Sequence, residues 1–357
     1  MNLPKLKIGD FVAKVPIIQG GMGVGVSKSK LAAAVANTGC IGVISAVQLG
    51  YNEPDFENNF KDANLRSLKS EIQKARKLSP NGILGINVLN AAKNYEEIVK
   101  TAVEEKIDLI ISGAGLPVDL PKFIKNTKTK IIPIVSSGKA AKIITKMWVK
   151  KYDYIPDAII VEGKEAGGHL GFALKDLLST STNTLQGIVK EVLDVIKGFE
   201  EKYKKNIPVI AAGGIFTGKD IAEYIKMGAA GVQMATSFVA TDECDAHINF
   251  KNAYINSKKE DIKLIKSPVG MPGRAINNNF VKALENGRIP IKKCYTCLKT
   301  CDPKTTPFCI SKALINAVNG DVDNGLVFAG SNAYRLTEIK PVKTLVDELV
   351  NEAESYL

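Results

Sequence analysis

Histidine is scarce in this 357-residue chain, and one of its two histidines follows a glycine-rich turn. The turn runs from Glu162 to His169 with the sequence EGKEAGGH, directly after a short apolar segment. An imidazole in that position could approach a substrate closely and exchange a proton near neutral pH. We therefore expect His169 to be catalytic rather than a residue that only caps a turn. His247 has no comparable surroundings, and we expect it to be structural.

Two further turns contain residues that commonly bind a phosphate group. Their sequences are AAGGI, over residues 211–215, and QMAT, over residues 233–236. Hydrogen-bond donors would come from the Thr236 hydroxyl and from the backbone N–H groups of Gly213, Gly214, Ala235 and Thr236. Either turn alone fits several phosphate-binding barrels, and glycine pairs also occur in ordinary tight turns. Together the two turns predict a phosphorylated ligand.

Four of the six cysteines are clustered late in the chain, at Cys294, Cys297, Cys301 and Cys309. Their spacing, C-x2-C-x3-C-x7-C, suits tetrahedral coordination of Zn²⁺ or ligation of an iron–sulfur cluster. A metal would stabilise a segment that has little core of its own. We expect a structural metal first and an iron–sulfur cluster second. Free thiols, or a disulfide formed after purification, are the alternative.

The residues that could take part in binding or catalysis follow short apolar runs, which we interpret as buried β-strands. There are eight such runs, at Ile17–Gly20, Cys40–Ala46, Ile83–Leu89, Leu109–Ala114, Lys130–Ser137, Ala158–Gly163, Pro208–Gly214 and Gly231–Phe238. Segments with helical spacing of apolar residues separate most of them. Eight alternating units predict an α/β fold of the TIM (β/α)8 barrel type, in which ligands bind at the carboxyl ends of the strands. A doubly wound open sheet is the alternative.

The strand pattern stops after Phe238. Residues 241–357 show short helical pieces, the cysteine cluster and a closing helix after Pro341, with apolar residues at 342, 345, 346, 349 and 350 on one face. We therefore divide the chain into a barrel over residues 1–240 and a partly helical, cysteine-containing C-terminal extension over residues 241–357. The extension could act as a lid.

Positive charge is concentrated in this extension. Residues 257–312 contain 12 Lys and Arg against 4 Asp and Glu, which gives +8 of the chain's net +11. The region lacks the interleaved aromatic residues of a nucleic-acid surface, so we expect no nucleic-acid partner. Solvated surface lysines are the plainest explanation. If the region borders the active face, an acidic partner fits it, such as a nucleotide phosphate, coenzyme A or an acyl carrier protein.

The composition is that of a globular protein, with 45% hydrophobic residues, 24% charged residues and a mean hydropathy of +0.01. The uncharged stretch from Leu31 to Asn52 is interrupted by polar residues and by Gly39. It therefore predicts a helix followed by a buried strand, and no membrane span. The sequence MNLPKLKIGD shows no export leader, and six cysteines do not make a disulfide framework. We expect a reducing, cytoplasmic location.

Five of these segments occur in an order that resembles the nitronate monooxygenase (2-nitropropane dioxygenase) family, which includes the FMN-dependent enoyl-acyl-carrier-protein reductases. The segments are IIQGGMG, INV, VEGKEAGGH, PVIAAGGI and GVQMATSFVAT, and the resemblance covers roughly residues 8–280. The ordered set is specific, although each piece is not. The resemblance implies a TIM barrel that binds FMN.

By position, the resemblance also implies a role for individual residues. It places the flavin ring along Gly20, Gly21 and Met22, the polar ring edge or ribityl chain at Asn87 and Glu162, and Gly167 close to the flavin. It places the phosphate at Gly213, Gly214, Gln233, Met234, Ala235 and Thr236. His169 matches the active-site histidine of the family.

Two departures leave the branch of the family open. Glu162 and Ala235 stand where the monooxygenases usually have Gln and Gly, and Glu162 looks more like the reductases. The leading hypothesis is oxidation of an alkyl nitronate with O2. The alternative is reduction of an enoyl thioester, with NADH or NADPH as the reductant and an acyl carrier protein as a candidate partner. A homodimer is considered for either branch.

Two further classes of protein are weighed against these. The inosine monophosphate dehydrogenase-like barrels rank third, because the chain has no catalytic-cysteine loop between the sixth and seventh strands. A protein that binds FMN without catalysis, and recruits an acidic partner through its extension, is the non-enzymatic alternative. The presence of His169 speaks against it.

Overall fold

Eight parallel strands form a closed barrel in this computed structural model, which describes residues 3–179 and 184–357. The strand order around the barrel is β10-β11-β3-β4-β5-β6-β7-β8. The strands are β3 (Ile17–Gln19), β4 (Ile41–Ser45), β5 (Ile83–Leu89), β6 (Leu109–Gly113), β7 (Lys130–Val135), β8 (Ile159–Glu162), β10 (Val209–Ala212) and β11 (Gly231–Met234). Each lies within one of the eight predicted runs, so the predicted TIM barrel is confirmed and the open sheet is wrong.

Apolar side chains from alternate strand positions fill the inside of the barrel. Ile111, Ile160 and Ile210, from three different strands, belong to one buried cluster. The N-terminal hairpin of β1 (Leu6–Ile8) and β2 (Phe11–Ala13) adds side chains to the same cluster. Its turn is held to the start of β7 by an ion pair of 2.7 Å between Asp10 and Lys130. The hairpin therefore covers the amino ends of the strands.

Amphipathic helices cover the outside of the barrel. They include α1 (Ser29–Asn37), α2 (Phe56–Leu78), α3 (Tyr95–Glu104), α4 (Gly138–Tyr152), α6 (Leu185–Tyr203) and α7 (Gly218–Lys226). A short 3₁₀ helix, Leu120–Phe123, takes this place between β6 and β7. The segment after Leu31 forms α1 and the buried strand β4, as predicted, and no helix in the described ranges is long and apolar enough to cross a membrane.

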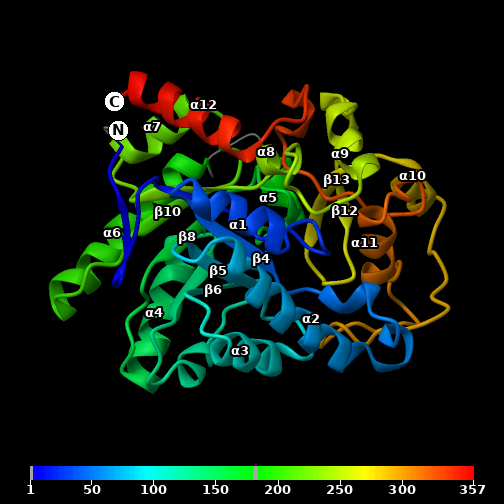
Figure 1. Ribbon diagram of the computed structural model, residues 1–357, viewed down its shortest axis with the longest axis horizontal. Helices are drawn as coiled ribbons and strands as arrows, with labels where there is room; N and C mark the ends of the chain where they lie inside the picture. Colours follow the sequence, from blue (N-terminus) through cyan, green and yellow to red (C-terminus); the bar gives the residue numbers. More distant parts are fainter. Residues whose placement is uncertain (1–2, 180–183) are drawn as a thin grey trace.

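The predicted closing helix is confirmed as α12 (Val342–Ser355). Its apolar face packs against α7 and α1, so the end of the chain supplies the eighth helix of the barrel (Figure 1). The packing at the start of α7 is tight, because a Cβ added to Gly218 would lie 2.4 Å from the backbone nitrogen of Ala353. The backbone N–H of Gly218 also donates to the Glu352 carboxylate at 2.7 Å.

The rest of the extension lies along one side of the barrel (Figure 1). Helix α8 (Thr236–Val239) ends the barrel segment, and the elements of the extension are α9 (Ile248–Ile255), β12 (Ile262–Lys266), β13 (Pro272–Ile276), α10 (Asn279–Glu285) and α11 (Ile310–Val318). Strand β13 pairs with β12 and, on its other edge, with β9 (Gly168–His169). Strand β9 belongs to the turn after β8 and precedes the short helix α5 (Leu174–Leu178). The extension therefore holds the turn that carries the predicted catalytic histidine.

Candidate active site

A cavity of about 1040 Å³ opens at the carboxyl ends of the barrel strands. Its wall contains all the residues predicted for catalysis or cofactor binding, which are Gly20, Gly21, Met22, Asn87, Glu162, Gly167, His169, Gly213, Gly214, Gln233, Met234, Ala235 and Thr236. A cavity at the upper end of the usual size range for ligand sites can hold a cofactor together with a substrate. The barrel brings the predicted residues together, and their individual roles remain predictions.

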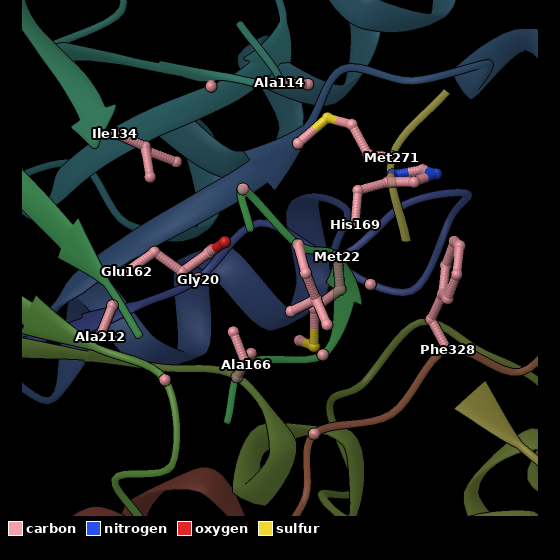
Figure 2. A pocket seen from close by; sticks show the side chains of 18 of the residues that line it. Gly20, Met22, Ala114, Ile134, Glu162, Ala166, His169, Ala212, Met271 and Phe328 are labelled. Carbon is pink, nitrogen blue, oxygen red and sulfur yellow. The ribbon is translucent and has the colours of Figure 1, made fainter. Parts of the chain in front are cut away.

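Glu162 supplies a polar group to one wall of this cavity (Figure 2). It ends β8 in register with Ala212 on β10, which is in register with Gln233 on β11. Within the described residues, the side chains of Glu162 and Gln233 form no hydrogen bond. Burial raises the pKa of Glu162 to about 7. A carboxyl group that is partly protonated near neutral pH can both donate to and accept from the polar edge of a ligand.

His169 lies on the other side of the cavity from Glu162, near Phe328 (Figure 2). Its Nε2 is 2.8 Å from Oγ of Ser267, in the loop between β12 and β13. The imidazole and Phe328 rings meet edge to face, with centroids 4.9 Å apart. Burial lowers the pKa of His169 to about 4, so the ring is neutral at pH 7. Its Nδ1 has no hydrogen-bond partner in the described part of the chain.

Arg274 on β13 fixes the turn that carries His169. Its side chain is buried, and Nη1 donates to the carbonyl oxygens of Lys164 at 2.7 Å and Ala166 at 2.5 Å. Gly167 follows in close contact with the extension, since an added Cβ would lie 2.6 Å from the carbonyl carbon of Ala329. The extension therefore positions the turn that carries His169 through both hydrogen bonds and backbone packing.

Ser267, Phe328 and Arg274 lie at the active site although the sequence did not predict them there. Ser267 and His169 are 98 residues apart, and no local pattern connects them. Two strands beside the active face could have been predicted from the sequence. The signals are the β-branched residues of β12 and the short apolar end of β13. No signal in the sequence indicates that Phe328 lies beside the imidazole.

Four backbone N–H groups at the ends of β10 and β11 are available to bind an anion. Gly213 and Gly214 have φ angles of +92° and +85°, and α8 begins directly after Ala235. Within residues 3–179 and 184–357, none of the N–H groups of Gly213, Gly214, Ala235 and Thr236 donates a hydrogen bond, and the Thr236 hydroxyl has no partner. Free backbone donors beside a hydroxyl fit a phosphate monoester such as that of FMN.

The four clustered cysteines are free thiols in the segment before α11. Cys294 is exposed and the other three are half-buried. In the described ranges, no group of three or more His, Cys, Asp or Glu side chains is arranged to hold a metal ion. Backbone hydrogen bonds of 3.0 Å, from Lys93 to Cys297 and from Lys299 to Ala91, join the segment to the barrel. The predicted zinc or iron–sulfur site, at Cys294, Cys297, Cys301 and Cys309, therefore gains no support from the geometry.

A TIM barrel with a large cavity at the carboxyl ends of its strands, free backbone N–H groups at two of those ends and a neutral imidazole is typical of enzymes that use a phosphorylated cofactor. The family model for nitronate monooxygenase matches residues 5–352, and the chain belongs to this family. The predicted family is confirmed, and the chain is an oxidoreductase.

Individual proteins are similar to this chain along nearly its whole length. A probable nitronate monooxygenase of Staphylococcus aureus (strain MSSA476) is 30% identical, over 96% of this chain and 95% of its own length. The structure of FabK from Thermotoga maritima has a TM-score of 0.72 and 28% identity, covering 96% of this chain and 94% of that chain. Nitroalkane oxidase from Streptomyces ansochromogenes shares the fold, with a TM-score of 0.74, 22% identity and 96% coverage of both chains.

Proposed function

We propose that this protein is an FMN-dependent nitronate monooxygenase, which oxidises alkyl nitronates with O2. The observation that carries the proposal is the neutral imidazole of His169, which lines a cavity whose wall also contains four backbone N–H groups without partners in the described residues. Membership of the nitronate monooxygenase family supports it.

The cofactor would be held along the ends of β3, β8, β10 and β11. The free N–H groups of Gly213, Gly214, Ala235 and Thr236 would bind its phosphate. Gly20, Gly21 and Met22 would lie along the ring. At Gly21 there is no room for a side chain, since an added Cβ would lie 2.3 Å from Cβ of Asn87. When bound, FMN supplies the capacity to accept an electron from the substrate and to react with O2.

His169 would act on the substrate through Nδ1. The Ser267 hydroxyl can donate to Nε2 or accept from it, so the hydrogen bond of 2.8 Å accommodates either neutral tautomer. With the proton on Nε2, Nδ1 can take a proton from a neutral nitroalkane. With the proton on Nδ1, the ring can donate to an oxygen of the nitronate anion. In both cases Ser267 and Phe328 hold the ring in place.

A second candidate function is NAD(P)H-dependent reduction of an enoyl thioester. It is favoured by two exposed lysines on β12, Lys263 and Lys266, because Lys266 also lines the cavity. Positive charge at the mouth would attract the phosphates of NAD(P)H or an acidic acyl carrier protein. Association as a homodimer, a cytoplasmic location and the domain boundary at residue 240 also remain predictions.

Oxygen consumption separates the two functions. We expect the FMN-loaded enzyme to consume O2 when ethyl or propyl nitronate is added, with no need for NADH or NADPH. The matched reaction contains NADPH and a crotonyl thioester under nitrogen. Its rate is measured as the loss of NADPH absorbance. Anaerobic NADPH oxidation that depends on the thioester, without nitronate-dependent uptake of O2, would replace the first proposal with the second.

A further inference from the structure

A second cavity adjoins the active site and is not explained by the cofactor or by His169. It has a volume of about 310 Å³ and lies between the segments that follow β4 and β5, helix α2 and the start of α11. It shares five lining residues with the active-site cavity, which are Val24, Val47, Leu89, His169 and Leu314. The two cavities therefore meet beside the imidazole. We call the second one the tail cavity.

The side chains that line the tail cavity are mostly apolar. Phe60, Ala92, Ile98, Leu298 and Ile310 form much of its wall. At its outer end, Lys61 and Glu97 form an ion pair of 2.7 Å, and the exposed Lys93 lies nearby. The tail cavity thus extends from the reacting end of the active site toward the surface between α2 and α3.

The buried polar side chains of the tail cavity are already paired with one another. Gln48 donates to the Ser311 hydroxyl at 2.9 Å and accepts from the Asn64 amide at 2.6 Å. The Asn64 carbonyl accepts from the backbone N–H of Gly50 at 2.8 Å. Satisfied groups of this kind offer little to a polar ligand, because a new hydrogen bond would have to replace an existing one. The cavity is therefore suited to an apolar group.

We propose that the tail cavity binds the unbranched alkyl chain of the substrate, while the reacting group lies beside His169. The reacting group follows from the proposed function, whereas the chain site follows from the apolar wall and the shared residues. The same chain could belong to an alkyl nitronate or to an acyl thioester. In either case the enzyme should prefer chains of several carbons over two-carbon substrates, since burying each methylene group changes affinity by roughly fourfold.

The test measures the equilibrium binding of straight-chain carboxylates, from acetate to decanoate, to the FMN-loaded enzyme. Binding is detected by the change in flavin absorbance. A carboxylate shares the planar, singly charged head of a nitronate and needs no turnover. We expect affinity to rise by roughly fourfold per methylene until the cavity is full. Affinity that does not depend on chain length in the wild-type enzyme would overturn the proposal.

Two variants test whether the alkyl chain of the ligand lies in the tail cavity. Ala92 is buried and lines only the tail cavity, so Ala92→Leu should weaken octanoate binding by about sixteenfold, the equivalent of two methylene groups, and leave acetate unchanged. Ala283→Leu, on the exposed face of α10, is the control and should change neither. Phe60→Ala enlarges the same cavity and should move the preference to longer chains. Equal effects on acetate and octanoate in both cavity variants would contradict the proposal.

Turnover then distinguishes the source of the chain. Alkyl nitronates and enoyl thioesters of two to ten carbons are compared as substrates, and the series that shows the length preference identifies the source. If neither series is turned over but the carboxylates show the preference, the proposed function fails and the tail cavity stands. If nitronates are turned over without a length preference, the proposed function stands and the tail cavity fails.

Discussion

Replacing His169 with asparagine is expected to lower kcat/KM for an alkyl nitronate by roughly 10²-fold or more, with FMN still bound. The neutral imidazole can exchange a proton with the substrate, whereas an amide can donate a hydrogen bond but takes up and releases no proton near neutral pH. The measurement is initial O2 consumption as a function of nitronate concentration. His247→Asn is the control, because His247 accepts a hydrogen bond at the start of α9 and does not line the cavity. An unchanged kcat/KM would return His169 to a structural role.

The pH dependence gives the same prediction a second readout. Because the pKa of His169 is about 4, the ring stays neutral above about pH 5, and the ratio of wild-type to variant kcat/KM should be constant from pH 6 to 9. The unfolded chain, with a histidine pKa of 6.5, binds more protons between pH 4 and 6.5. The stabilising contribution of this residue is therefore lost as pH falls through that window. If the ratio of wild-type to variant kcat/KM fell as pH decreased, with a midpoint near pH 6.5, His169 would instead be a solvated histidine.

Replacing Gly213 with alanine is expected to weaken FMN binding by tenfold to a hundredfold, the effect of losing one hydrogen bond to a charged group. Gly213 has a φ of +92°, and an added Cβ would lie 2.9 Å from the carbonyl oxygen of Gly163, so the turn has to shift. The shift would move the N–H groups that we assign to the phosphate. The measurement is the quenching of flavin fluorescence when FMN is added to the apoprotein.

The control for this variant is Gly228→Ala. Gly228 has a similar φ of +101°, but an added Cβ would meet only Leu193, at 3.6 Å, and the residue does not line the cavity. Both variants should lose about 1–2 kcal/mol of unfolding free energy from backbone strain, while only Gly213→Ala should lose FMN affinity. Equal FMN affinity in the two variants would show that the turn after β10 does not bind the phosphate.

The barrel could be predicted from the sequence because its strands are buried on both faces and therefore read as continuous apolar runs. Parallel strands also place their carboxyl ends on one side, so residues as distant as Gly20, Glu162 and Thr236 could be expected in one cavity before any contact was known. The last run was predicted too long, since residues after Met234 form α8 instead of continuing β11.

Contacts between distant segments could not be predicted in the same way. Strand β9 has only two residues, too few to produce a periodic pattern, and its pairing with β13 depends on the packing of the extension. The closing helix α12 was visible in its apolar spacing, but its place between α7 and α1 was not. The cysteine spacing predicted a metal, yet spacing alone does not fix where thiol side chains point, and the described residues show no metal-binding arrangement.

The proposed activity is tested most directly by the absorbance of the bound flavin under anaerobic conditions. The enzyme is mixed separately with propyl nitronate, NADH and NADPH, and the spectrum of each mixture is followed. We expect the nitronate to bleach the flavin absorbance and both nicotinamide cofactors to leave it unchanged. Bleaching by NADH or NADPH, with an unchanged spectrum in the presence of the nitronate, would contradict nitronate oxidation and identify a reductase.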